Sequence, residues 1–243
     1  MRVLLTRPER RAQPSLARLE AAGHAAENIA LTYPQHDPAA VCAALDTDFT
    51  ALAVTSSEAV QALVLAEVNR DILSRPLFAV GDTTAAAAGQ AGFHRIISGP
   101  GDGLGLAETV IASGLVARDG PALLYLAGEP HAKTFEAALA QAGLQTTTVI
   151  AYRMMPVDFG GQDRAALLDG FAPDAIAFYS QATAERFFSV FGSEIAQPDR
   201  QSMIFACLSA QIAAAIPKDL PNRVLVAETK QETALFALLA EGG

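Results

Sequence analysis

Polar side chains that could bind an anionic ligand recur directly after short apolar stretches of the sequence. They carry hydroxyl or amide groups, and a helical pattern begins at once after each of them. The backbone N–H groups at the start of a helix can hold a carboxylate or a phosphate. Any one of these turns could be an ordinary helix N-cap, but their recurrence favours a binding site. The segments are Thr55-Ser56-Ser57, Gly81-Asp82-Thr83-Thr84, Ser98-Gly99-Pro100-Gly101, Ser180-Gln181 and Ser209-Ala210-Gln211.

The sequence carries no motif for metal, redox or covalent chemistry. Its four histidines have no metal-ligand spacing, and Cys42 and Cys207 are too few for a zinc site or a disulfide framework. A G-x-S-x-G elbow is also absent. An enzyme with this sequence is therefore expected to use no cofactor and no metal, and to work by positioning and hydrogen bonding.

The elements that must position these residues alternate between strand and helix. Short β-rich stretches separated by helical patterns indicate parallel sheets with helical crossovers. In such sheets ligands bind at the carboxyl ends of the strands, which is where the polar segments fall. The predicted strands are Val3–Leu5, Asn28–Leu31, Ala51–Val54, Leu77–Val80, Arg95–Ile97, Leu123–Leu126, Val149–Tyr152, Ile176–Tyr179 and Ile204–Cys207.

The second half of the chain resembles the first. The segment Ala175–Phe187 matches Ala51–Leu63, and similar matches on either side predict a tandem repeat of about 120 residues. One possible domain boundary is the end of the first repeat near Gly120-Pro121. The other possibility is a pair of proline-marked linkers, Tyr33–Pro38 and Tyr152–Pro156. The sequence alone leaves both divisions open.

Composition excludes several classes of protein. The 243 residues carry a net charge of −9, which argues against a partner such as nucleic acid that needs a basic surface. A hydrophobic fraction of 51% is ample for a buried core. No apolar run approaches the length of a membrane span, and the start MRVLLT lacks a signal-peptide core. With two cysteines that look like reduced thiols, a cytoplasmic location is expected.

Six short motifs occur in an order that resembles the uroporphyrinogen-III synthase family over nearly the whole chain. The second repeat departs from the family in having Ser180-Gln181 where Ser-Pro is common, and Leu208-Ser209-Ala210-Gln211 where a glycine precedes threonines. The motifs are VLLTRP (Val3–Pro8), TSSEAV (Thr55–Val60), FAVGDTTA (Phe78–Ala85), TVIAYRMMP (Thr148–Pro156), IAFYSQATAERF (Ile176–Phe187) and VAETKQETAL (Val226–Leu235).

The resemblance implies a fold and an activity. The expected fold is α/β with two lobes, each a parallel sheet flanked by helices, joined by a two-strand linker and separated by a cleft. One lobe would contain residues 1–34 and 154–243, and the other residues 37–150. The expected enzyme is a cofactor-free, cyclising lyase of tetrapyrrole and heme biosynthesis. It closes hydroxymethylbilane into uroporphyrinogen III with inversion of the last pyrrole ring and loss of water.

The resemblance also implies roles for individual residues. Tyr152 matches a tyrosine that the family uses near the leaving hydroxyl, where a phenol with a pKa of about 10 can donate a proton. The alternative is a linker tyrosine that only packs against a lobe. Arg10, Arg153 and Lys230 could add local positive charge, although each alone is better read as a solvated surface residue. The expected substrate-binding residues are Thr55, Ser56, Ser57, Gly81, Thr83, Thr84, Ser180, Gln181 and Arg7.

Other partners and functions follow from the same features. A monomer that opens and closes is expected, with transient contact to the preceding enzyme, hydroxymethylbilane synthase. The main alternative is a two-lobed protein that binds an anion or metabolite without catalysis and has no need for Tyr152. A structural or interaction protein is a weaker alternative, because it predicts a large exposed apolar patch that the sequence does not show.

Overall fold

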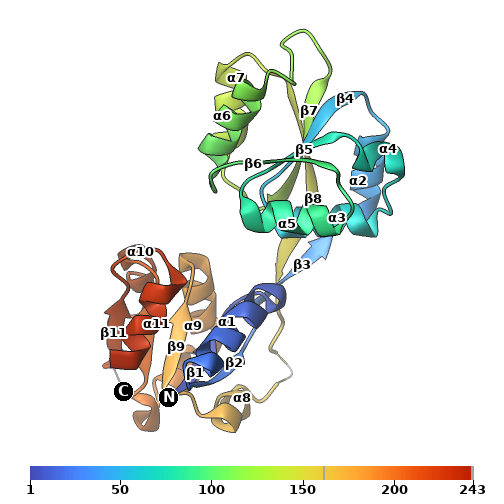
Figure 1. Cartoon of the computed structure of the whole chain (residues 1–243). Coiled ribbons are helices and arrows are strands. Elements are labelled where there is room, and N and C mark those ends of the chain that lie inside the picture. The colour runs from blue at the N-terminus through green and yellow to red at the C-terminus, as the bar shows by residue number, and fades with distance from the viewer. Residues whose placement is uncertain (161, 242–243) are drawn as a thin grey trace. The chain divides into compact units, whose positions relative to one another are not determined.

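Two sheets of short apolar strands organise the chain, as the computed structural model shows (Figure 1). It describes residues 1–160 and 162–241. The chain divides into two compact units. Unit 1 consists of Met1–Tyr33 and Pro156–Gly243, and unit 2 consists of Pro34–Met155. Both ends of the chain therefore belong to unit 1, whereas unit 2 is a continuous segment.

Unit 2 is built on a sheet with the strand order β3-β8-β7-β4-β5-β6. The pairs β8 with β7, β7 with β4, β4 with β5 and β5 with β6 are parallel, in agreement with the alternation of strand and helix in the sequence. Its elements are β3 (Thr32–His36), α2 (Pro38–Leu45), β4 (Phe49–Val54), α3 (Ser57–Leu65), α4 (Arg70–Leu73), β5 (Pro76–Ala79), α5 (Asp82–Gln90), β6 (Arg95–Ser98), α6 (Gly103–Ser113), β7 (Ala122–Glu129), α7 (Thr134–Gln141) and β8 (Thr146–Pro156).

Helices cover both faces of the unit 2 sheet. On one face α2, α3 and α5 pack side chains such as Leu63 against Leu52 of β4. On the other face α6 and α7 pack side chains such as Leu106 and Phe135 against Tyr125 of β7. Figure 1 shows α6 and α7 together on this side of the sheet. Strand β4 is buried on both sides, so its sequence reads as a continuous apolar run rather than an alternating one.

Local sequence sets where the unit 2 helices begin. Asp37 caps α2 by accepting a hydrogen bond from the N–H of Ala40 at 3.0 Å, and Pro38 follows as the first helical residue. Asp102 caps α6 in the same way, through the N–H of Gly105 at 2.8 Å. These caps satisfy N–H groups that the helix itself leaves without partners.

Unit 1 has a sheet with the strand order β11-β10-β9-β1-β2, in which each neighbouring pair is parallel. The first strand of the chain lies between β2 and β9, so residues from the two ends of the sequence share one core. Its elements are β1 (Arg2–Leu5), α1 (Glu9–Ala21), β2 (Ala25–Asn28), α8 (Arg164–Phe171), β9 (Ala175–Phe178), α9 (Gln181–Ile195), a 3₁₀ turn (Pro198–Arg200), β10 (Ile204–Cys207), α10 (Ala210–Ala213), β11 (Arg223–Val226) and α11 (Glu232–Glu241).

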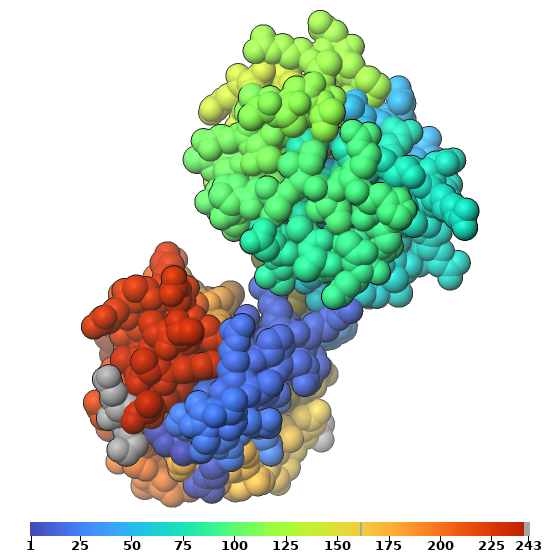
Figure 2. Space-filling model, in the orientation of Figure 1, coloured from blue at the N-terminus to red at the C-terminus, as the bar shows by residue number. Residues whose placement is uncertain are grey.

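The unit 1 sheet is also covered on both faces. Helices α8, α9 and α10 pack on one face, where Phe178, Phe187 and Phe191 form a group of aromatic contacts. Helices α1 and α11 pack on the other face through Leu19 and Leu235. Figure 2 shows that the surfaces of the N-terminal and C-terminal segments, blue and red, meet in this unit. The predicted α/β class with mostly parallel strands flanked by helices is confirmed.

One predicted strand is misplaced. The second strand of the chain runs over Ala25–Asn28, not over Asn28–Leu31. This strand is at the edge of its sheet and pairs only with β1 among the described strands, so it can contain polar residues such as Glu27. Leu31 is apolar because it is buried in the core without belonging to β2. The segment Tyr33–Pro38, expected to be a linker, contains most of β3.

The buried position of β4 predicts a large effect of truncating Leu52. Leu52 has no exposed surface, whereas Leu104, at the start of α6, is 55% exposed. Leu52→Ala is expected to lower the free energy of unfolding of unit 2 by about 2–5 kcal/mol, because it removes buried methyl groups and leaves a cavity. The matched change Leu104→Ala is expected to alter it by no more than about 0.5 kcal/mol. Urea unfolding of both variants checks this, and equal effects would contradict the assigned core.

Candidate functional site

Tyr152 lies in β8 beside an irregularity in the pairing of β8 with β7. Ala127 pairs with Ile150, but Gly128 pairs with Tyr152, so Ala151 is an extra residue that forms a bulge. Ile150 packs on one face of the sheet, and Ala151 and Tyr152 both pack on the other. Regular alternation would have placed Tyr152 on the same face as Ile150. The bulge therefore sets the direction of the Tyr152 side chain, which is 9% exposed.

A second phenol, Tyr125 of β7, packs on the opposite face of the sheet from Tyr152 but is near enough to interact with it electrostatically. Tyr125 is 1% exposed, and its hydroxyl forms a hydrogen bond of 2.9 Å with Oγ1 of Thr55, the first residue after β4. Burial raises the pKa of Tyr125, the hydrogen bond with Thr55 lowers it in part, and the nearby Glu136 and Tyr152 raise it further. Tyr125 is therefore a neutral phenol at physiological pH.

A half-buried histidine lies beside Tyr152 and contacts a buried glutamate. The ring of His36, from β3, has its centroid 6.0 Å from that of Tyr152. Nε2 of His36 lies 3.0 Å from Oε2 of Glu58, in the first turn of α3. Their side chains are only 14% and 8% exposed. We call Thr55, Tyr125, Tyr152, His36 and Glu58 the tyrosine cluster.

A further polar group lies where β7 leads into α7. Nε2 of His131 lies 2.9 Å from Oε1 of Glu136, and Nζ of Lys133 lies 3.0 Å from the same histidine nitrogen. The ring of His131 meets that of Tyr125 edge to face, with centroids 5.7 Å apart. Burial raises the pKa of Glu136, but the hydrogen bonds from His131 and Lys133 outweigh it and lower the pKa overall. The tyrosine cluster thus has a charged carboxylate near Tyr125.

The predicted residues of the first polar turn lie at the tyrosine cluster, and one of them also acts as a cap. Thr55 is half-buried and bonded to Tyr125. Ser56 is buried and is the N-cap of α3, accepting from the N–H of Glu58 at 3.0 Å. Ser57 is half-buried and begins the helix. The cap interpretation therefore holds for Ser56, whereas the hydroxyl of Thr55 is bonded to Tyr125 instead.

The second polar turn lies at the end of β5, the neighbour of β4. Gly81 precedes α5 and supplies no side-chain cap. Thr83 is exposed, whereas Thr84 is 6% exposed and faces the core. The first N–H groups of α5 are thus without a side-chain cap, in contrast with those of α3, and Thr83 is the more accessible of the two threonines.

The predicted residues of unit 1 form a separate group. Ser180 caps α9, accepting from the N–H of Thr183 at 3.2 Å. Gln181, the first residue of α9, is exposed and accepts a hydrogen bond of 3.1 Å from Nε2 of Gln211. The structure thus links the turn after β9 to the turn after β10, as the carboxyl-end rule for parallel sheets predicts.

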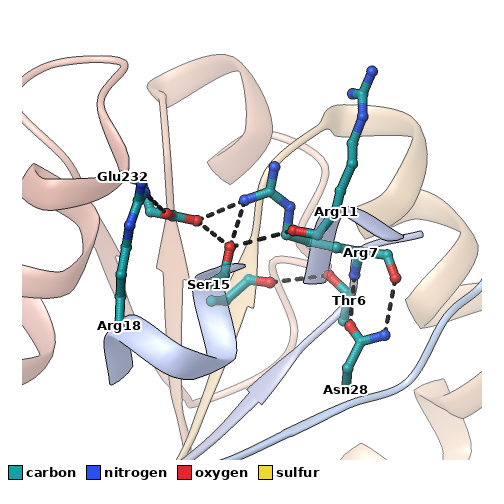
Figure 3. A network of polar contacts seen from close by, with 8 residues as sticks. Thr6, Arg7, Arg11, Ser15, Arg18, Asn28 and Glu232 are labelled. Carbon is teal, nitrogen blue, oxygen red and sulfur yellow. Dashed lines mark hydrogen bonds and ion pairs between the residues drawn. The ribbon is translucent and has the colours of Figure 1, made fainter. Parts of the chain in front are cut away.

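Arg7 is bound within unit 1 by a network of polar contacts (Figure 3). Its Nη1 donates to Oε1 of Glu232 at 2.6 Å and to Oγ of Ser15 at 2.8 Å. Its guanidinium lies 4.1 Å from the centre of the Tyr179 ring. Arg18 donates to the second oxygen of Glu232 at 2.6 Å. Arg7 was predicted to bind an anionic ligand. Any such ligand would have to compete with the carboxylate of Glu232 for its guanidinium.

Sequence reasoning missed most of the tyrosine cluster. Tyr125 stands inside an apolar strand, so nothing local marks its hydroxyl as reaching a neighbouring strand. His36 was part of an expected linker. Glu58 was within the quoted motif TSSEAV, and its place three residues after Thr55 could have signalled that it lies near the same sheet edge.

Within residues 1–160 and 162–241, no group of three or more His, Cys, Asp or Glu side chains could hold a metal ion. Over the same described residues, no helix combines the length and apolar character that crossing a membrane requires.

Comparison with known proteins gives a family and two structural relatives. A family model described as uroporphyrinogen-III synthase HemD matches residues 14–237. Uroporphyrinogen-III synthetase from Helicobacter pylori is similar in structure, with a TM-score of 0.67, 15% identity and 99% of each chain covered. A mutant uroporphyrinogen III synthase from Thermus thermophilus has a TM-score of 0.54 and 20% identity, covering 100% of this chain and 98% of its own. No curated protein matches the sequence. At these identities the structures show the fold alone.

The Arg7 network predicts a pH-dependent contribution to stability. Burial raises the pKa of Glu232, but hydrogen bonds from Ser15 and Arg18 and the charge of Arg7 outweigh it, so the pKa is lowered below its ordinary value of 4.5. The carboxylate thus stabilises the folded state above pH 4.5, and this stabilisation is lost as the pH falls further. Glu232→Gln is expected to destabilise the protein at pH 7, with a difference from wild type that shrinks below pH 4.5. Urea unfolding across this range measures it, with Glu228→Gln, an exposed carboxylate, as control. A difference that is constant with pH would contradict the assigned network.

Proposed function

The chain belongs to the uroporphyrinogen-III synthase family, and from this premise we propose that its chemistry is centred on Tyr152 and the tyrosine cluster. The enzyme is a cyclising lyase that closes hydroxymethylbilane into uroporphyrinogen III, with inversion of the last pyrrole ring and loss of water, in tetrapyrrole and heme biosynthesis. The observation that carries the proposal is the phenol of Tyr152, which the bulge in β8 directs onto the face of the unit 2 sheet where it lies beside His36.

The reaction needs a weak acid and control over the shape of the substrate. The bond between carbon and the leaving hydroxyl breaks with both electrons on oxygen, and a proton delivered to that oxygen makes it water. The cation that remains is stabilised by resonance in the pyrrole. The substituted α-carbon of the last pyrrole then attacks it and forms a spiro intermediate. The older bond from this carbon to its methylene bridge breaks, which leaves a cation on the neighbouring ring, and the free α-carbon of the inverted pyrrole attacks that cation. The proton that this carbon loses as the ring regains aromaticity balances the one donated. We assign the donation to the Tyr152 hydroxyl.

Substrate binding is proposed to rely on hydroxyls and backbone N–H groups. The carboxylates of hydroxymethylbilane would meet Thr55, Ser56, Ser57, Gly81, Thr83 and Thr84 in unit 2, and Ser180, Gln181 and Arg7 in unit 1. Support comes from the N-terminus of α5, whose first N–H groups have no side-chain cap and can accept an anion. Placing the flexible substrate so that the inverted closure is faster than the simple one is a proximity effect.

The larger organisation belongs to the same proposal. We propose that the units act as two lobes, residues 1–34 with 154–243 and residues 37–150, which arose as a tandem repeat and are joined by β3 and β8. Both cysteines are unpaired, which fits a reducing, cytoplasmic setting. We further propose a monomer that uses no cofactor and receives its unstable substrate from hydroxymethylbilane synthase.

Product analysis tests the activity directly. The purified protein is given freshly made hydroxymethylbilane, the products are oxidised, and the type I and type III porphyrin isomers are separated. Predominantly type III product is expected, because only the enzyme favours closure with an inverted ring. Type I product alone, formed at the spontaneous rate by folded protein, would exclude the synthase and leave a binding protein in its place.

Replacing the phenol tests the role of Tyr152. Tyr152→Phe keeps the ring but removes the proton donor, so kcat is expected to fall by roughly 10-fold to 10²-fold, the low end of general acid catalysis, because a pyrrolic carbinol ionises with little help. KM is expected to change less than kcat. The matched control is Tyr33→Phe, since Tyr33 is 48% exposed. Steady-state kinetics decide, and wild-type kcat in Tyr152→Phe would remove Tyr152 from the mechanism.

A further inference from the structure

The ring of Tyr152 lies directly across the backbone of Gly128 in the neighbouring strand. A Cβ atom placed on Gly128 would stand 2.3 Å from Cζ, 2.4 Å from the hydroxyl oxygen and 2.7 Å from Cε1 of Tyr152. Real Cβ atoms essentially never approach another heavy atom within 3.0 Å. Any side chain at position 128 is therefore incompatible with Tyr152 in its present position.

Space, not backbone conformation, explains the glycine. Gly128 does not have the positive φ that would require glycine, and it is paired within the parallel ladder of β7 and β8. A glycine inside a strand weakens the strand relative to other residues, and it commonly marks a place where another group approaches the backbone closely. Here that group is the phenol, because the bulge at Ala151 puts Tyr152 directly opposite Gly128.

The contact controls where the hydroxyl can be. To restore an ordinary contact of 3.4 Å with a Cβ at position 128, the hydroxyl oxygen would have to move by about 1 Å. Tyr152 is 9% exposed and has the His36 ring 6.0 Å away, so the ring can move only by disturbing its neighbours. A displacement of about 1 Å at a reacting group can lower a rate by about 10²-fold.

We propose that Gly128 is a positioning residue for ring closure. Because Gly128 has no side chain, the ring of Tyr152 can lie against the backbone of β7, and this contact determines where the Tyr152 hydroxyl stands. This inference rests on the proposed role of Tyr152. It assigns no contact between Gly128 and the substrate. The effect of Gly128 on catalysis must therefore pass through the phenol and disappear when the hydroxyl is absent.

A double-mutant cycle tests the proposal. Gly128→Ala is expected to lower kcat by roughly 10-fold to 10²-fold with little change in KM. In the Tyr152→Phe background the same change is expected to lower kcat no further. The control is Gly89→Ala in α5, whose added Cβ would meet the nearest atom, Cδ1 of Ile96, at an ordinary 3.7 Å. An equal loss of kcat in both backgrounds would overturn the proposal.

A spectroscopic measurement separates this proposal from the proposed function. The chain has four tyrosines and no tryptophan, so 3-fluorotyrosine labelling gives four fluorine NMR signals. The Tyr152 signal is identified by its loss in Tyr152→Phe. Gly128→Ala is expected to shift it while leaving the Tyr179 signal of unit 1 in place, and an unshifted Tyr152 signal would refute the positioning role. Full activity of Tyr152→Phe would refute the catalytic role of the phenol, and with it the role of Gly128 in ring closure, whether or not the signal shifts.

A third comparison applies if Gly128→Ala does not fold. The clash should vanish when the ring is removed, so adding Gly128→Ala to Tyr152→Ala is expected to leave the melting temperature of Tyr152→Ala unchanged. If Gly128→Ala is as damaging in the Tyr152→Ala background as in the wild-type protein, the glycine is needed for β7 itself and the proposal is wrong.

Discussion

Hydrogen bonding between β1 and β9 is the constraint on which the whole arrangement depends. Residues Val3–Leu5 pair with Ala175–Ala177, so the first strand of the chain completes a sheet made largely from its last third. Asp174 strengthens the join, because its carboxylate accepts from both the backbone N–H and the guanidinium of Arg2. Once these ends are paired, residues 34–155 must form a unit of their own, with β3 and β8 as the strands through which the chain passes.

Electrostatics explains how a protein with a net charge of −9 can handle an anionic substrate. The side-chain cations near the polar turns are largely engaged: Arg7 with Glu232, and Arg153 with Glu129 at 2.7 Å. The backbone N–H groups at the start of α5, which have no side-chain cap, offer a further source of positive potential. The burial of Tyr125 and Tyr152 also suits a cation that water would trap, because a buried setting keeps water away from it.

Sequence reasoning located the strands whose burial makes them uniformly apolar, such as Ala51–Val54, and the turns that follow them. It failed where tertiary contacts override local pattern: the polar strand Ala25–Asn28 is stabilised by its place at a sheet edge. It identified Tyr152 only through resemblance, because the bulge that directs the side chain depends on register with β7. The partners Tyr125 and His36 come from other strands, and no spacing along the chain brings them together.

The discontinuity of unit 1 has a consequence for synthesis on the ribosome. Residues 34–155 emerge as one continuous stretch, and at about 5–20 residues per second they have several seconds in which to fold before β9 to β11 exist. During that time β1 can pair only with β2, and Leu4 lies on the face of the sheet that α8, α9 and α10 cover only later. The N-terminal segment thus keeps part of its apolar surface exposed until translation delivers the helices and strands that bury it.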